Sequence, residues 1–161
     1  MAPGYAFRPM AGTDLPLIQS WLETPEVRRW WGEPAEQYAL VSDDLSHPDM
    51  DQFIVALGGH PFGYIQCYAL STWNQGFGPQ PPRTRGIDQF IGAPEMIGRG
   101  HGSRFIRQFA DTLLKSGIPR IVTDPDPDNG RAVRAYAKAG FQRDRMVDTP
   151  DGPALLMMRN P

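Results

Sequence analysis

Residues 98–103 read Gly-Arg-Gly-His-Gly-Ser, and this short stretch decides the fold. Before it, residues 85–91 alternate like a strand, and after it the apolar side chains of residues 103–114 recur at helical spacing. Gly100 and Gly102 leave backbone N–H groups uncovered at the positive end of the helix dipole, where a pyrophosphate fits. Strand, glycine turn and helix therefore predict an α/β protein with a main-chain site for a phosphorylated molecule.

Two common phosphate-binding motifs are poor matches to this turn. A nucleotide P-loop needs lysine followed by serine or threonine after its last glycine, whereas this chain continues Ser103-Arg104. A dinucleotide-binding fold needs several βαβ units, which the pattern of this chain does not supply.

A second motif follows at residues 129–141, which read NGRAVRAYAKAGF. Asn129 can cap the start of a helix, and Gly140 can end it in the left-handed conformation. Together with the glycine turn, Asn129, Tyr136 and the Gly140-Phe141 ending resemble the GNAT acetyltransferase family, in which these residue types recur at this spacing. One departure is Ile97, where that family commonly has arginine or glutamine, so backbone donors and Arg99 are expected to compensate.

The resemblance implies one acetyltransferase domain over residues 1–161, with an α/β (α+β) fold. It implies a mixed central sheet of about seven strands with splayed central strands, flanked by about four helices. It also implies acetyl-CoA as co-substrate. The residues expected to bind it are Phe90, Ile91, Gly98, Arg99, Gly100, His101, Gly102, Ser103 and Asn129.

Hydrophobic periodicity and turn residues place the individual elements. The strands are expected at residues 5–9, 52–57, 62–68, 85–91, 121–123, 141–147 and 154–158. The helices are expected at residues 14–22, 25–31, 35–45, 103–114 and 130–139. Residues 71–83, rich in glycine and proline, are expected to form an irregular surface loop.

More of the chain resembles one branch, the aminoglycoside 6′-N-acetyltransferases. The matching segments are Trp30-Trp31-Gly32 and residues 61–66, 85–89, 123–125 and 149–154. Members of that branch move acetyl to a primary amine of a polycationic aminosugar, and they have acceptor-pocket aspartates at the positions of Asp88 and Asp124. The resemblance therefore implies an acceptor site, and its expected residues are Trp30, Trp31, Asp88, Asp124 and Asp151.

The chemistry of amine acylation calls for such residues. An amine arrives protonated, binds a carboxylate and must lose its proton before it attacks a thioester. Asp88 is expected to be the base and the amine anchor, directly or through water, with Asp124 as a second anion. Backbone N–H groups near Phe90 and Ile91 are expected to stabilise the oxyanion, and Tyr136 to protonate the leaving thiolate.

Composition limits the remaining possibilities. The 161 residues include 16 basic and 18 acidic ones, a net charge of −2, which argues against a nucleic-acid partner. With no long apolar run and no basic leader at Met1–Gly4, we expect a cytoplasmic protein without a membrane partner, as monomer or homodimer. Cys67 is expected in the core, and the three scattered histidines predict no metal site.

Three other functions stay open at this stage. A GNAT acyltransferase of siderophore biosynthesis, or one acting on another small polyamine-like acceptor, would share the framework, although such enzymes typically carry a histidine that residues 87–90 lack. A non-catalytic sensor of CoA or an aminoglycoside would need to have lost its catalytic groups. Acetylation of protein amines would need an open groove.

Overall fold

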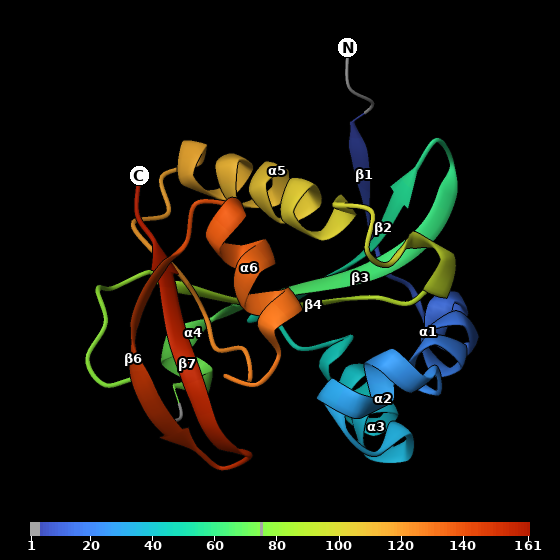
Figure 1. Cartoon of the computed structure of the whole chain (residues 1–161), viewed down its shortest axis with the longest axis horizontal. Coiled ribbons are helices and arrows are strands. Elements are labelled where there is room, and N and C mark those ends of the chain that lie inside the picture. The colour runs from blue at the N-terminus through green and yellow to red at the C-terminus, as the bar shows by residue number, and fades with distance from the viewer. Residues whose placement is uncertain (1–3, 75) are drawn as a thin grey trace. The chain divides into compact units, whose positions relative to one another are not determined.

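The computed structural model describes residues 4–74 and 76–161, shown in Figure 1. The N-terminal Met1–Pro3, in the stretch expected to carry no leader, and Gln75, in the expected irregular loop, lie outside the described residues. The strands are β1 (Tyr5–Pro9), β2 (Met50–Leu57), β3 (His60–Ala69), β4 (Arg85–Ile91), β5 (Ile121–Thr123), β6 (Gln142–Thr149) and β7 (Gly152–Arg159). The helices are α1 (Leu15–Leu22), α2 (Pro25–Trp31), α3 (Pro34–Asp44), α4 (Leu70–Trp73), α5 (His101–Lys115) and α6 (Gly130–Lys138), with 3-10 turns at Gly12–Asp14 and Pro94–Met96.

The seven strands have the order β1-β2-β3-β4-β5-β7-β6 and form one mixed sheet, which confirms the expected fold class. The pairs β1–β2, β5–β7 and β6–β7 are antiparallel, and β4–β5 is parallel. The described chain has six α-helices rather than the expected four or so. The helix that sequence reasoning missed is α4, a single turn at the start of the stretch expected to be irregular, and four residues are too few to show a helical period.

The chain divides into two compact units, and β3 and β4 each contribute residues to both. Unit 1 is the described part of residues 1–66 together with Gln89–Arg99, and unit 2 is Cys67–Asp88 together with Gly100–Pro161. The β2–β3 hairpin predicted from sequence lies in unit 1 as far as Gln66 of β3. Its two-residue turn is Gly58-Gly59, whose φ angles of 56° and 78° are those a type I′ turn needs.

Unit 1 is built around an apolar cluster under helices α1 to α3. The ring of Phe90 meets the edges of Trp21 and Trp31, with centroid distances of 6.2 and 5.1 Å. A side chain at Gly92 would place its Cβ 2.1 Å from the Trp21 indole, so only glycine lets this ring lie against the chain. The buried members of the cluster are Met10, Ile18, Trp21, Leu22, Val27, Val41, Ile54, Tyr64 and Phe90.

Unit 2 contains the two helices that the sequence motifs predict. The predicted apolar face of α5 supplies Phe105, Ile106 and Phe109 to the core, and all three are buried. A guanidinium of α5, that of Arg107, donates to the Lys138 carbonyl at the end of α6 and so joins the two helices. On the strand side, Leu156 and Met157 of β7 are fully buried.

Parallel pairing of β4 with β5 is short. The registered pairs are Arg85 with Ile121 and Gly86 with Val122, although β4 continues to Ile91. The next contact is made by a side chain, since the buried hydroxyl of Thr123 donates to the Ile87 carbonyl at 3.1 Å. Regular strand pairing therefore stops where the family resemblance predicts splayed strands.

Candidate functional site

The glycine turn enters α5 as the sequence predicts. Gly98 and Gly100 have φ angles of 78° and 82°, in the left-handed region that favours glycine, and Gly100 is the N-cap residue. Gly100 has no side chain that could cap the first N–H groups of the helix, and the Ser103 hydroxyl donates to the Gly100 carbonyl at 3.2 Å. A Cβ at Gly98 would meet nothing within 4 Å, so the turn is open above its backbone.

This turn is a candidate site for an anionic group. The first N–H groups of a helix lack intrahelical partners, and α5, with 15 residues, is long enough for a substantial dipole at this end. Gly98, Arg99 and Gly100 are exposed, whereas His101, Gly102 and Ser103 are half-buried. The donors come from the main chain, so the departure from the family pattern at Ile97 leaves them intact.

Both ends of α6 follow the second motif. The side-chain oxygen of Asn129 accepts a hydrogen bond from the Ala132 N–H at 3.2 Å, which confirms the predicted cap. At the other end, Gly140 has a φ of 97°, and the Phe141 N–H donates to the Tyr136 carbonyl at 3.0 Å. This pattern is a Schellman ending. It explains why a helix at this place needs glycine followed by an apolar residue.

Tyr136 occupies the inner face of α6. Its side chain is 3% exposed, and its ring meets that of Phe141 edge to face at a centroid distance of 5.6 Å. The ring is therefore fixed by packing.

Three carboxyl groups of unit 2 influence one another. Asp88 lies on β4, Asp124 follows the last residue of β5, and Asp151 lies in the turn between β6 and β7. Burial, then the charge of Asp88, then that of Asp151 raise the pKa of Asp124 to about 8. The structure thus brings together the three acidic residues that the resemblance assigned to the acceptor, and their mutual repulsion favours a cation among them.

Sequence reasoning missed Tyr68, whose phenol interacts with two of these carboxyl groups. Burial, followed by the charges of Asp88 and Asp124 and then by Tyr136, raises the pKa of the Tyr68 phenol well above its ordinary value. Its ring lies over Gly86, where a Cβ would stand 2.3 Å from the ring. The only sequence signal for this contact is a glycine in the middle of a strand, which often marks a close approach.

Cys67 is buried, as expected of a core residue. The Arg85 guanidinium donates to its sulfur and to its carbonyl oxygen, both at 3.3 Å. Within the described residues, no group of three or more histidine, cysteine, aspartate or glutamate side chains is arranged to hold a metal ion. None of the helices in that part of the chain combines the length and apolar character that crossing a bilayer requires.

The remaining site candidates lie in unit 1. Trp31 is half-buried against Phe90, and Trp30 is half-buried with the Arg29 guanidinium 4.6 Å from its ring centre. The Phe90 side chain is only 5% exposed, so a role toward a ligand must come from its backbone. Ile91, the last residue of β4, is half-buried.

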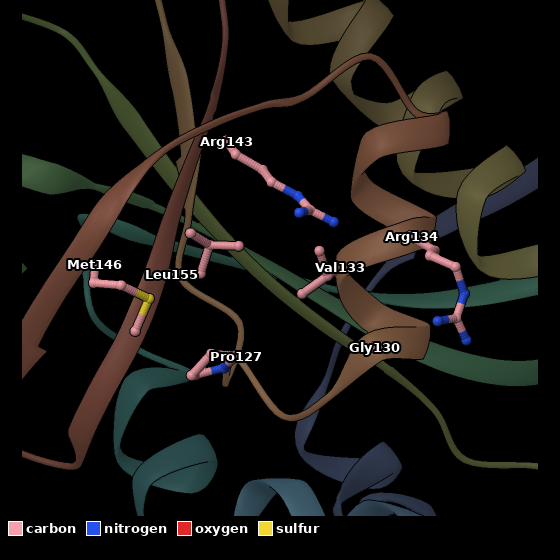
Figure 2. Close-up of a pocket in the computed structure, with 7 residues that line it drawn as sticks. All are labelled: Pro127, Gly130, Val133, Arg134, Arg143, Met146 and Leu155. Carbon is pink, nitrogen blue, oxygen red and sulfur yellow. The ribbon is translucent and has the colours of Figure 1, made fainter.

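A separate groove of about 330 Å³ lies in unit 2. Figure 2 shows Arg143 extending toward α6, while Arg134 extends from the other side of that helix. The lining residues are Pro127, Gly130, Val133, Arg134, Arg143, Met146 and Leu155, none of which was a predicted site residue.

Comparison with known proteins agrees with this geometry. The family model described as "Acetyltransferase (GNAT) domain" matches residues 11–149. The aminoglycoside N(6′)-acetyltransferase type 1 of Klebsiella pneumoniae is 34% identical over 94% of this chain and 81% of that protein. Among solved structures, the aminoglycoside acetyltransferase AAC(6′)-Ib in complex with coenzyme A and kanamycin superposes with a TM-score of 0.85 at 33% identity, over 98% of this chain and 95% of that one.

A more distant relative has a different acceptor in its name. The N5-hydroxyornithine acetylase of Beauveria bassiana is 25% identical over 86% of this chain, which corresponds to 26% of that longer protein.

Proposed function

Because this chain belongs to the GNAT acetyltransferase family, we propose that it transfers acetyl from acetyl-CoA to the 6′ amine of an aminoglycoside by direct attack. The proposal treats residues 1–161 as one acetyltransferase domain that works as a monomer or homodimer. The likeness to aminoglycoside N(6′)-acetyltransferases extends over nearly the whole chain, which supports this class of acceptor as well as the coenzyme.

The observation that carries the acceptor assignment is the cluster of Asp88, Asp124 and Asp151. A carboxyl such as Asp124, whose pKa is raised to about 8 by burial and then by neighbouring carboxylates, is stabilised in its ionised form by a bound cation. Aminoglycosides carry several ammonium groups, so they supply the positive charge that this cluster lacks. An uncharged acceptor would leave the repulsion in place.

Within this cluster, Asp88 is proposed to anchor the reacting ammonium and to take its proton, directly or through water. Asp124 is proposed as a second anion for the acceptor, and Asp151, which is exposed in its turn, as a contact for a more distant amine. General-base catalysis of this kind contributes about 10²- to 10⁴-fold to a rate.

At the donor end, coenzyme A supplies the thioester whose acetyl group is transferred. The amides of the turn around Gly98 and Gly100 are proposed to hold its pyrophosphate, with Asn129 fixing the start of α6. The backbone amides of Phe90 and Ile91 are proposed to hold the charge that develops on the thioester oxygen. Tyr136 is proposed to donate a proton to the leaving sulfur.

The direct test is an acceptor assay with acetyl-CoA and kanamycin that follows release of the CoA thiol, with the modified nitrogen located by NMR. We expect acetylation at the 6′ amine by the wild type and a loss of about 10²-fold or more in kcat for Asp88→Asn. Asp43→Asn, an exposed carboxylate on α3, is the matched control and should keep wild-type rates. Full activity of Asp88→Asn would remove Asp88 from its role.

One observation favours a second candidate, acylation of a hydroxylamine in siderophore biosynthesis, because the Beauveria relative is named for that acceptor. N5-hydroxyornithine should therefore be assayed beside kanamycin. Acetylation of hydroxyornithine alone would replace our first proposal, and binding of both substrates without turnover would favour a sensor.

A further inference from the structure

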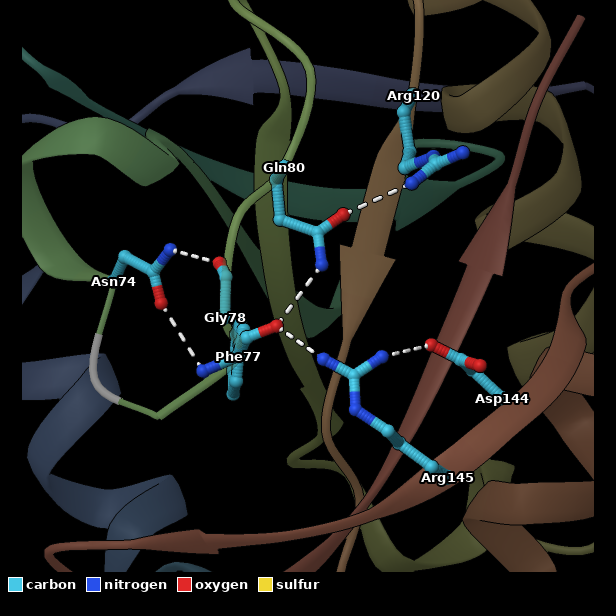
Figure 3. A network of polar contacts seen from close by, with 7 residues as sticks. All are labelled: Asn74, Phe77, Gly78, Gln80, Arg120, Asp144 and Arg145. Carbon is cyan, nitrogen blue, oxygen red and sulfur yellow. Dashed lines mark hydrogen bonds and ion pairs between the residues drawn. The ribbon is translucent and has the colours of Figure 1, made fainter.

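One backbone carbonyl organises the loop that leads into β4. The Phe77 carbonyl accepts two hydrogen bonds, from Gln80 Nε2 at 3.0 Å and from Arg145 Nη2 at 2.6 Å (Figure 3). Phe77 itself is buried. Arg145 belongs to β6, so this bond joins the loop of residues 76–84 to a strand more than sixty residues away in sequence.

Further bonds secure the same loop at both ends. Asn74, just after α4, accepts from the Phe77 N–H at 3.1 Å and donates to the Gly78 carbonyl at 2.7 Å. Gln80 in turn accepts from Arg120 Nη1 at 3.0 Å, next to the start of β5 (Figure 3). The loop ends where the Thr84 hydroxyl donates to the Pro81 carbonyl at 2.6 Å. Although it lacks regular secondary structure, its path is defined.

The backbone of the loop also fits closely against β6. Gly76 has a φ of 103°, and a Cβ there would lie 2.3 Å from the Asp148 carbonyl oxygen of β6. At Gly78, with a φ of 71°, a Cβ would lie 3.0 Å from the Arg145 guanidinium. Both glycines are therefore required where the loop touches this strand and its arginine.

The loop and the carboxylate cluster have two structural connections. The chain enters the loop from α4. The ring of Trp73 in α4 meets the ring of Tyr68 edge to face at a centroid distance of 5.7 Å. The charges of Asp88 and Asp124 in turn help to raise the pKa of Tyr68. On the other side, β6 leads directly into the turn of Asp151. There the Thr149 hydroxyl accepts from the Asp151 N–H at 3.2 Å.

We propose that Arg145 is a positioning residue for the acceptor: it holds the loop of residues 76–84 against β6, and thereby keeps Trp73 and Tyr68 in place relative to Asp151. Arg145 does not touch the acceptor in this proposal. A polycation with several rings must meet more than one carboxylate at once, so a fixed spacing between them lowers the cost of binding. The inference rests on the proposed function for the nature of the acceptor, but its account of the loop is independent of it.

Two variants of Arg145 and one control test the proposal. Arg145→Met removes the bonds to Phe77 and Asp144 while keeping much of the side-chain stem. Arg145→Lys keeps the charge. Arg143→Met changes an exposed arginine of the same strand that makes no hydrogen bond or ion pair to the described loop residues 76–84, and it serves as the matched control.

The first readout needs no activity. Trypsin cleavage after Arg83, an exposed residue with a φ of 68°, is followed by mass spectrometry in the intact variants. We expect Arg145→Met to be cut at this bond about tenfold faster than the wild type, and Arg143→Met to be cut at the wild-type rate, because release of a loop increases the population open to protease. Equal cleavage in all variants would overturn the proposal.

The second readout is steady-state kinetics with kanamycin and acetyl-CoA. For Arg145→Met we expect the KM for kanamycin to rise about tenfold, because the loop loses its hydrogen bond from the charged guanidinium of Arg145 and no longer keeps the acceptor residues in place. The kcat and the KM for acetyl-CoA should stay within about twofold. Arg145→Lys should recover part of the loss. An unchanged kanamycin KM, or an equal rise in both KM values, would overturn the proposal.

The two assays distinguish failure of the proposed function from failure of the proposed role of Arg145. If the wild type does not acetylate kanamycin, the aminoglycoside assignment fails, and the cleavage at Arg83 still decides whether Arg145 holds the loop. If Arg145→Met does not fold, Gln80→Met removes the other donor to the Phe77 carbonyl and is examined by the same two readouts.

Discussion

The hydroxyl of Thr123 donates to the backbone carbonyl of Ile87 at 3.1 Å, and each of these residues directly precedes one of the three proposed acceptor carboxylates. The bond joins β5 to β4 just after their last registered pair, Gly86 with Val122. It therefore fixes the spacing between the backbone at Asp88 within β4 and the backbone at Asp124 just after β5.

Replacing Thr123 by valine should loosen this spacing with little change in shape. Thr123 is 1% exposed, and its loss leaves the Ile87 carbonyl without this donor, so we expect a destabilisation of about 1–3 kcal/mol in urea unfolding. The pH profile of kcat/KM should also shift, because the coupling between the two carboxylates changes. Thr123→Ser keeps the hydroxyl and should restore the profile; a valine variant with the wild-type profile would contradict a positioning role.

Asp124 should make stability depend on pH. Its pKa is about 8 in the folded protein and near 3.8 in the unfolded chain, so the folded state holds a proton that the unfolded state has released between those values. The free energy of unfolding should therefore fall as pH rises from about 4 to about 8, by at most about 1.4 kcal/mol per pH unit and by less because Asp124 is partly exposed.

Urea unfolding at pH 5, 7 and 9 checks this expectation. The stability of Asp124→Asn relative to the wild type should increase with pH. Asp126 is an exposed carboxyl two residues further on, and the free energy of unfolding of Asp126→Asn should have the same pH dependence as that of the wild type. A constant difference between Asp124→Asn and the wild type would show that Asp124 titrates normally.

A methyl group at Gly86 should disturb the acceptor cluster through Tyr68. The added Cβ would lie 2.3 Å from the tyrosine ring, and overpacking of this kind costs about 1–3 kcal/mol. We expect Gly86→Ala to lower the melting temperature and to raise the KM for kanamycin more than that for acetyl-CoA. Gly12→Ala, where a Cβ meets nothing within 4 Å, is the control. If Gly86→Ala keeps the wild-type melting temperature and the wild-type KM for kanamycin, the Tyr68 ring has room to move.

Loss of the cap at α6 should affect the coenzyme end instead. Asn129→Ala removes the acceptor of the Ala132 N–H and should cost about 1 kcal/mol of stability. Because the start of the helix frays, the KM for acetyl-CoA should rise while that for kanamycin changes less. Asn129→Ser retains a capping oxygen and should stay close to the wild type; equal behaviour of the two variants would rule out the cap as the cause.

The hydroxyl of Tyr136 should be separable from its ring. Tyr136→Phe keeps the edge-to-face contact with Phe141, so stability should change by no more than about 1 kcal/mol. If the hydroxyl supplies the proton to the leaving sulfur, kcat should fall about 10²-fold or more, measured by CoA thiol release. Tyr38→Phe, a half-buried tyrosine of α3, is the comparison. A Tyr136→Phe enzyme with normal kcat would leave the tyrosine a packing role only.

Features encoded in short stretches could be predicted from the sequence. The seven strands follow from alternation and turn residues, and the cap at Asn129 and the ending at Gly140 depend on neighbours within a few positions. The three proposed acceptor aspartates were identified through family motifs rather than spacing, because their proximity arises only when β4, β5 and the β6–β7 turn come together.

What could not be predicted depends on partners distant in the chain. Nothing near Thr123 indicates that its hydroxyl will meet Ile87, and nothing near Arg145 indicates that it will bind Phe77. Nothing near Tyr68 in the sequence indicates that its ring will lie over Gly86. Glycine and proline in residues 71–83 suggest irregular backbone, which the structure has at residues 76–83 but not in α4, and they do not reveal that side-chain hydrogen bonds hold the loop of residues 76–84.

The open glycine turn before α5 has a consequence for how such an enzyme can change over generations. The proposed donors to a pyrophosphate are main-chain amides shaped by Gly98 and Gly100, so exchange of the flanking side chains, Arg99 or His101, should leave these donors in place. The acceptor cluster, in contrast, is made of side chains that single codon changes can replace. Substitutions can therefore change the acceptor specificity while binding of the acyl donor is retained.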